Sequence, residues 1–335
     1  MLLRWAQTII AGAKPKSAMP IMLLPASELT GIGIVEMVTD GEKQFACIEA
    51  LSRRFPSMLA VHTGMDLSVE AEAFGCRVRF TDNEVPSVEN LVIAGMEDIE
   101  RLTVPPVGAA RTSEYVWAAR LAGEAIRDRT VLAGCIGPIS LAGRLMDTSA
   151  LMLALMKHAA QAHALLEKCT TFLIEYAKAF KTSGVDGIIV AEPMAGLLSP
   201  DKCEAFSSRY MARMVDALQD EHFTVILHNC GRTQKLVGSM VNTGARGLHF
   251  GNAVNMNKIA PLIPADRLFF GNVDPVGVLR NGLPDDVERS VMKLLEDMRP
   301  YDNFILSSGC DLPPGTPLAN IDAFFRAFDR FQKNA

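Results

Sequence analysis

The chain has 335 residues, of which 49% are hydrophobic and 21% are charged, and its formal net charge is −5. This apolar content excludes intrinsic disorder as the main state of the chain. A mildly acidic chain also lacks the basic stripe that binding to DNA or RNA requires, so we expect no nucleic-acid partner.

Membrane insertion is not expected, because no apolar run reaches the roughly 18 residues that a bilayer requires. The nearest run, residues 131–143, is interrupted by glycine and proline, and the apolar patch at residues 8–13 is too short for a signal-peptide core. The seven cysteines are an odd number without close pairs, which argues against a disulfide framework. We therefore expect a cytoplasmic protein with no membrane partner.

Short apolar runs alternate with longer helical stretches along the chain. Continuous apolar runs separated by helices are typical of buried parallel strands. Eight such runs predict a (β/α)8 TIM barrel, formed by a single domain over residues 1–335 with about the first 18 residues as a leading segment. The runs are Met19–Pro25, Met58–Met65, Val131–Pro138, Gly187–Pro193, Thr224–Cys230, Gly247–Asn252, Leu268–Asp274 and Asn303–Asp311.

The stretches between these runs predict helices. In residues 285–298, Val287, Val291 and Leu295 recur at helical spacing and form one apolar face. Residues 150–181 contain neither glycine nor proline and predict one long helix. Residues 77–80 alternate in polarity, which predicts a small extra hairpin near the mouth of the barrel.

Polar residues follow most of the apolar runs. In a parallel barrel the carboxyl ends of the strands share one face, and active sites are built there. For any one of these residues, the simpler interpretation is that a polar side chain marks the end of a strand. The polar residues at the ends of the runs are Asp66, Glu192, His228, Asn229, Cys230, Asn252, Asn272, Asp274, Cys310 and Asp311.

A metal site is predicted by three of these residues. His228 and Cys230 are two apart on an expected strand, so their side chains point the same way, and Cys310 ends the last run at the same mouth. Three nitrogen and sulfur ligands with an open fourth position are typical of catalytic zinc, and thiolates favour zinc over magnesium or calcium. A packed core is the alternative for the His-x-Cys pair alone. His62 and His249 lie within expected strands and are interpreted as hydrogen-bonded core histidines.

The segments around the expected ligands resemble a known motif. His228-Asn229-Cys230-Gly231, followed by residues 308–317, resembles the His-x-Cys…Cys zinc motif of cobamide-dependent methyltransferases. These enzymes are a branch of the uroporphyrinogen decarboxylase superfamily that includes the methylcobamide:coenzyme M methyltransferases. Residues 64–75, 137–143 and 271–275 fit too, and the resemblance extends from about Pro20 to the last helix. It implies a (β/α)8 barrel.

The decarboxylase branch fits this sequence less well. Its members carry an arginine-rich segment near the N-terminus, whereas the matching residues 21–28 contain no arginine. They also have histidine in a Gly-His-Gly turn where this chain has Cys310. Asp66 matches the pyrrole-binding aspartate of the decarboxylases, but both branches share that position. The methyltransferase branch is therefore favoured.

The resemblance implies transfer of a methyl group from a methylcobamide, held on a separate corrinoid-binding protein, to an acceptor. The acceptor would be a thiol such as coenzyme M or homocysteine, or a folate. Bound Zn²⁺ would deprotonate a thiol and orient it. Two alternatives stay open: a uroporphyrinogen decarboxylase-type enzyme, and a non-catalytic module that binds a corrinoid or a metal.

Other residues at the expected mouth are assigned more specific roles. Glu192 is the candidate for a displaceable fourth ligand or a proton acceptor, with a solvated turn glutamate as the alternative. Asp66 is expected to bind the acceptor or the edge of the corrinoid. Asn272, Asp274 and Asp311 are candidates for cofactor binding, for which shaping or capping the loops is the alternative.

Overall fold

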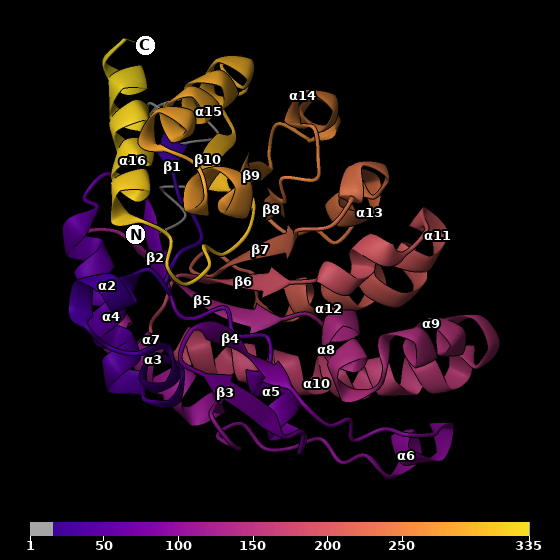
Figure 1. The fold of residues 1–335 in the computed structure, drawn as a ribbon. Helices are drawn as coiled ribbons and strands as arrows, with labels where there is room; N and C mark the ends of the chain where they lie inside the picture. Colours follow the sequence, from indigo (N-terminus) through magenta and orange to yellow (C-terminus); the bar gives the residue numbers. More distant parts are fainter. Residues whose placement is uncertain (1–15, 335) are drawn as a thin grey trace.

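A computed structural model describes residues 16–334, and its central feature is a curled parallel sheet. Within that range eight strands pair in the order β1-β10-β9-β8-β7-β6-β5-β2 (Figure 1). A bridge between Ala18 and Met58, and a 2.8 Å hydrogen bond from Leu59 N–H to the Ala18 carbonyl, join the two edges. The predicted (β/α)8 TIM barrel is confirmed. The expected leading segment falls almost wholly outside the described residues.

The strands of the barrel are short and well separated along the chain. Their bounds are β1 (Ser17–Ala18), β2 (Ala60–His62), β5 (Thr130–Ile136), β6 (Gly187–Ala191), β7 (Thr224–Asn229), β8 (Gly247–Phe250), β9 (Leu268–Val273) and β10 (Phe304–Ser308).

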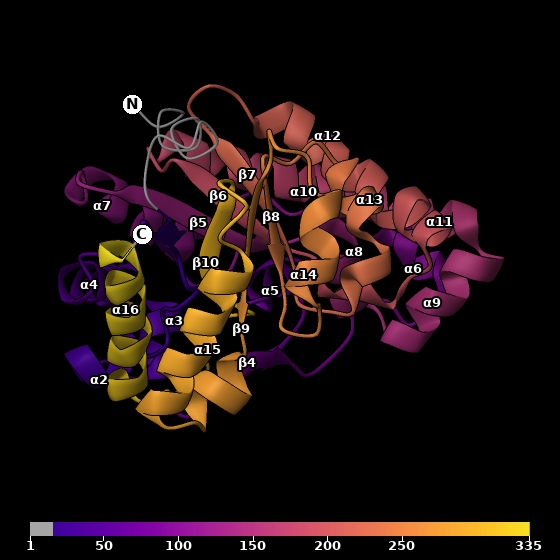
Figure 2. The same ribbon diagram turned by 90° about the horizontal axis from the view of Figure 1, so that it is seen from above.

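Helices lie outside the strands when the barrel is viewed from above (Figure 2). The α-helices are α2 (Ala26–Thr30), α3 (Ile34–Thr39), α4 (Gly41–Arg54), α5 (Val69–Ala73), α6 (Met96–Arg101), α7 (Thr112–Ala125), α8 (Pro138–Leu145), α9 (Thr148–Lys157), α10 (Ala159–Thr182), α11 (Pro200–Cys203), α12 (Arg209–Leu218), α13 (Val237–Val241), α14 (Met256–Ile259), α15 (Pro284–Asp297) and α16 (Leu318–Lys333). Shorter 3-10 and π segments are η1 (Pro193–Leu197), η2 (Glu204–Ser208), η3 (Thr233–Lys235), η4 (Ala260–Leu262) and η5 (Pro275–Arg280).

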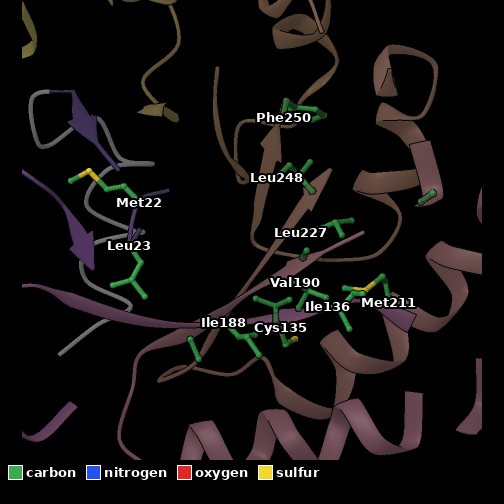
Figure 3. Close-up of a cluster of buried hydrophobic side chains, with 14 of the residues drawn as sticks. Met22, Leu23, Cys135, Ile136, Ile188, Val190, Met211, Leu227, Leu248 and Phe250 are labelled. Carbon is green, nitrogen blue, oxygen red and sulfur yellow. The ribbon is translucent and has the colours of Figure 1, made fainter. Parts of the chain in front are cut away.

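The alternation of side chains along each strand divides the apolar residues into two sets. One set packs between the sheet and the helices, and Figure 3 shows Val190, Leu227 and Leu248 of this set together with Met211 of α12. The other set fills the barrel interior and consists of Met19, Ala60, Leu132, Ile189, Ile226, Leu268, Phe270 and Ile305. The barrel is therefore a packed core, and only its mouth has room for chemistry.

The predicted extra hairpin is confirmed. Strands β3 (Val78–Thr81) and β4 (Glu84–Val88) pair antiparallel as a separate sheet, with Val78 opposite Val88. Both of its strands contact α3.

Two details of the sequence-based prediction are wrong. The first strand is Ser17–Ala18 and not the apolar run that follows it, because residues 19–24 continue from β1 into buried but non-strand backbone. The long helix expected over residues 150–181 is two helices, α9 and α10. The chain leaves helical geometry at His158, with φ −133° and ψ 48°, and no glycine or proline marks that break.

No single helix in the described part of the chain is long and apolar enough to span a membrane. Helices α8 and α9 meet the criteria of length and composition only as a pair, and they are bent by 115° from one another.

The interior layer predicts a stability effect. Replacing Ile226, which is 0% exposed, by alanine should lower the free energy of unfolding by about 2–5 kcal/mol, because a cavity remains in a close-packed barrel. Leu262→Ala is the matched control, since Leu262 is 57% exposed. This substitution should lower the free energy of unfolding by less than about 0.5 kcal/mol. Urea unfolding measures both, and equal losses would contradict the described interior.

Candidate metal centre

Three potential ligands meet at the carboxyl ends of β7 and β10. The alternation that points Ile226 into the barrel also points His228 and Cys230 toward its interior and mouth. Cys310 comes from the turn that follows β10. One ligand atom from each of His228, Cys230 and Cys310 lies within 4.8 Å of the other two. The structure therefore brings together the three residues that the sequence predicts as ligands.

The geometry of this cluster fits a tetrahedral zinc ion. Zinc binds sulfur at about 2.3 Å and nitrogen at about 2.0–2.1 Å. At a tetrahedral angle, these bonds place a sulfur ligand and a nitrogen ligand of the same ion about 3.6 Å from each other. The distance from His228 Nε2 to Cys310 Sγ is 3.6 Å. One imidazole and two sulfurs also form a donor set that zinc accepts readily.

The two thiols influence each other's protonation. The hydrogen bond with Cys310 lowers the pKa of the Cys230 thiol well below its ordinary value. The interaction with Cys230, together with burial, raises the pKa of Cys310. The pair therefore favours one thiolate and one thiol, and a metal that binds both sulfurs as thiolates must release the remaining proton.

Two glycines allow the strand ends to come this close. A Cβ at Gly251, just after β8, would lie 2.5 Å from the Cα of Cys230. A Cβ at Gly309 would lie 2.6 Å from the backbone nitrogen of Asn252. Backbone atoms cannot move aside as flexible side chains can, so these positions require glycine for the ligand-bearing turns to pack together.

A small cavity of about 60 Å³ adjoins the three ligands. Its walls are mainly apolar, and none of the described residues that line it carries a positive charge. The lining residues are Ile21, Met65, Leu67, Ala191, Pro193, His228, Cys230, Cys310 and Asp311. The cavity therefore offers a mainly apolar approach to the cluster for a small molecule.

The other ring nitrogen of His228 is hydrogen-bonded inside the barrel. Its Nδ1 lies 2.8 Å from Nδ1 of His249, whose Nε2 lies 2.9 Å from Oγ of Ser307. Burial holds the pKa of His249 well below its ordinary value. His249 was predicted as a core histidine with satisfied hydrogen bonds, and it is one, but its contact with a ligand was not predicted. The signal lies in the strand register, because His228 and His249 are directly paired between β7 and β8.

Glu192 follows β6 in the chain, and its carboxylate lies against the N-terminus of α8. Its carboxylate accepts hydrogen bonds from Ile139 N–H at 3.1 Å, Ser140 N–H at 3.2 Å and the Ser140 hydroxyl at 2.8 Å. Burial raises the pKa of this carboxyl to about 7. It is fully buried rather than a solvated turn residue, and its observed partners belong to a helix terminus. Its predicted role as a ligand or proton acceptor stays a prediction.

Glu192 gives the protein a testable pH dependence. Its folded pKa of about 7 lies above the ordinary 4.5, so the folded chain holds more protons and stability must fall as pH rises through that window. Glu192→Gln removes this titration. We expect the variant to gain about 1–3 kcal/mol relative to the native chain between pH 5 and pH 8, measured by urea unfolding. Parallel pH profiles of the two proteins would contradict the assignment.

Asp66 is held in a buried ion-pair network. Its carboxylate accepts hydrogen bonds from Arg111 Nη1 at 2.5 Å and from the backbone and hydroxyl of Ser68 at 2.9 and 2.7 Å. The Nε of Arg111 also donates to Glu72 at 2.6 Å. The side chains of Asp66 and Arg111 are only 2% and 8% exposed. These contacts give Asp66 a structural role, and its predicted contact with acceptor or corrinoid stays a prediction.

The network predicts a large cost for removing its cation. Arg111→Met leaves Asp66 buried without its partner and should destabilise the fold by about 3–5 kcal/mol. Arg120→Met breaks the ion pair with Glu124, in which the two side chains are 58% and 57% exposed. This variant should lose less than about 1 kcal/mol of stability. Chemical denaturation compares the two variants, and an Arg111 variant as stable as the control would refute the structural role.

The remaining predicted site residues have different surroundings. The amide of Asn272 donates to the carbonyls of Gly251 and Val254, at 2.9 and 2.8 Å, so it holds a loop at the mouth. Asp274 accepts hydrogen bonds from two N–H groups at the start of η5. Asp311 lines the cavity, and burial raises its pKa to about 7. Their predicted roles in cofactor binding stay predictions.

Comparisons with known proteins give consistent matches. The sequence model of the family described as uroporphyrinogen decarboxylase (URO-D) matches residues 15–331. A methylcobamide:CoM methyltransferase MtbA from Methanosarcina acetivorans is 30% identical over 298 residues, which cover 88% of this chain and 86% of the relative. A uroporphyrinogen decarboxylase from Coxiella burnetii is 26% identical, with 86% and 82% covered. The solved structure of a methyltransferase from Methanosarcina mazei covers 99% of both chains, with 24% identity and a TM-score of 0.87.

Proposed function

This chain belongs to the uroporphyrinogen decarboxylase family, and we propose that it is a zinc-dependent methyltransferase of that family. The methyl group would come from a methylated corrinoid carried by a separate protein, and a small thiol would receive it. The observation that carries this proposal is the convergence of His228, Cys230 and Cys310 beside a cavity. The relatives named as methylcobamide:CoM methyltransferases support the same reaction class.

The three residues would hold the metal and leave one position open. Zn²⁺, when bound there, would supply a place where the acceptor's sulfur is held as a thiolate. Cys230 and Cys310 would place negative charge next to that sulfur, which keeps it electron-rich enough to attack a methyl group. Ile21, Met65 and Leu67 line the approach and would keep water away from the nucleophile.

A small thiol is the acceptor that we favour. The cavity lies directly against the ligand cluster, so the sulfur of a small thiol could reach the position left open on the metal. Coenzyme M and homocysteine are both small thiols. The relatives' names favour coenzyme M.

Decarboxylation is the second candidate, because the family model and the relative from Coxiella burnetii carry that name. A uroporphyrinogen has many carboxylates and needs cationic partners. Residues 21–24 are apolar and buried, and the described lining of the cavity contains no lysine or arginine. These features favour methyl transfer over decarboxylation.

Metal content tests the proposal first. Elemental analysis should find about one zinc per chain, and Cys230→Ser and Cys310→Ser should each lose most of it, because a hydroxyl replaces a thiolate ligand. Cys203→Ser is the matched control, since Cys203 is buried away from the site and contacts the hydroxyl of Ser208. Zinc retained in both ligand variants would overturn the proposed site.

Turnover is then followed by the change in the cobalt absorption spectrum when methylcobalamin loses its methyl group. We expect demethylation with 2-mercaptoethanesulfonate or homocysteine. Zinc binding without demethylation by any thiol or folate would indicate the non-catalytic module instead. Conversion of uroporphyrinogen would establish the decarboxylase.

A further inference from the structure

A chain of hydrogen bonds connects the predicted ligand His228 to the backbone of the first strand region. His228 Nδ1 lies 2.8 Å from His249 Nδ1, and His249 Nε2 lies 2.9 Å from Ser307 Oγ. The hydroxyl of Ser307 is in turn 2.6 Å from the carbonyl oxygen of Met19. All three side chains are buried, at 3%, 0% and 0% exposure. Because buried polar groups need hydrogen-bond partners, each of these contacts has to join one donor to one acceptor.

The direction of this chain follows from its last member. A carbonyl oxygen can only accept a hydrogen bond, so the Ser307 hydroxyl donates its one proton to the carbonyl oxygen of Met19. Ser307 Oγ must then accept from His249, which places the proton of His249 on Nε2. His249 bonds to no carboxylate among its described partners, and an unpaired charge in the barrel interior would be costly, so its ring is neutral. Its Nδ1 therefore carries a lone pair and accepts a hydrogen bond.

We infer that His249 is a positioning residue that fixes the tautomer of His228. A lone pair on His249 Nδ1 requires a proton on His228 Nδ1, so Nε2 is the nitrogen of His228 that remains to bind a metal. That atom is the one that lies 3.6 Å from Cys310 Sγ and belongs to the ligand cluster. The barrel backbone thus sets which nitrogen faces the metal before any metal arrives.

The packing of the two rings supports a fixed orientation. The rings of His228 and His249 meet edge to face, with centroids 4.6 Å apart and planes at 79°. The ring of His249 also stacks on Phe270, with centroids 6.0 Å apart and planes at 16°. His249 is therefore held from one face while its two nitrogens are bonded, so it can orient its neighbour. The role in zinc binding rests on the proposed function, whereas the tautomer does not.

The first experiment examines the metal-free protein. Long-range ¹H–¹⁵N NMR of histidine-labelled protein should show His228 as the Nδ1–H tautomer, with the signal assigned by its loss in His228→Gln. In His249→Phe this single tautomer should be lost, because no acceptor remains for Nδ1–H. A His228 ring without a proton on Nδ1 in the native protein would overturn the inference.

The second experiment measures zinc affinity by competition with a chromophoric chelator. His249→Phe should bind zinc about 10- to 100-fold more weakly, the usual loss when the partner of a metal-ligating histidine is removed. His249→Asn should recover part of this affinity, because its side-chain oxygen can accept from His228. Ser307→Ala should weaken binding less than His249→Phe.

His62→Phe is the matched control for general destabilisation. His62 is also buried in the barrel, but it accepts from Met22 N–H at 2.8 Å and contacts Thr63 at 2.7 Å. We expect its zinc affinity to match that of the native protein. Native affinity in His249→Phe would overturn the positioning role. If the native protein shows a proton on His228 Nδ1 but binds no zinc, the inferred hydrogen-bond chain would be correct. The proposed zinc-dependent function would then be wrong.

Discussion

The structure depends on one geometric constraint, the two-residue alternation of side chains along parallel strands that curl into a closed barrel. The alternation that buries Ile226 in the interior layer also directs His228 and Cys230 along the same side of β7. Parallel pairing from β7 through β8 and β9 to β10 brings Cys310 to the same mouth. Ligands 80 residues apart in the chain thus meet without a dedicated loop.

Polar groups in such an interior are stable only when each has a hydrogen-bond partner. His62 accepts from Met22 N–H, Ser308 accepts from Ile21 N–H, and Ser307 donates to the carbonyl of Met19. These contacts fix the segment after β1, which has little ladder pairing of its own. The Ser307 contact also belongs to the hydrogen-bond chain that reaches His228, so the segment after β1 and the predicted ligand share this residue.

Much of this arrangement can be predicted from the sequence because local periodicity carries it. The parallel strands, the extra hairpin and the three converging ligands all follow from alternation and chain order. The relation of His249 to His228 does not, because it depends on the register between β7 and β8. Likewise, the sequence does not predict that Asp66 pairs with Arg111 or that Glu192 accepts hydrogen bonds at the N-terminus of α8. Those partners lie 45 and 53 residues away, beyond the reach of local patterns.

X-ray absorption at the zinc edge of the metal-loaded protein tests the central claim most directly. The account predicts two sulfur ligands at about 2.3 Å and at least one imidazole nitrogen at about 2.0–2.1 Å. A third sulfur should join them when the acceptor thiol is added. A first coordination shell of oxygen and nitrogen alone, unchanged by thiol, would contradict it.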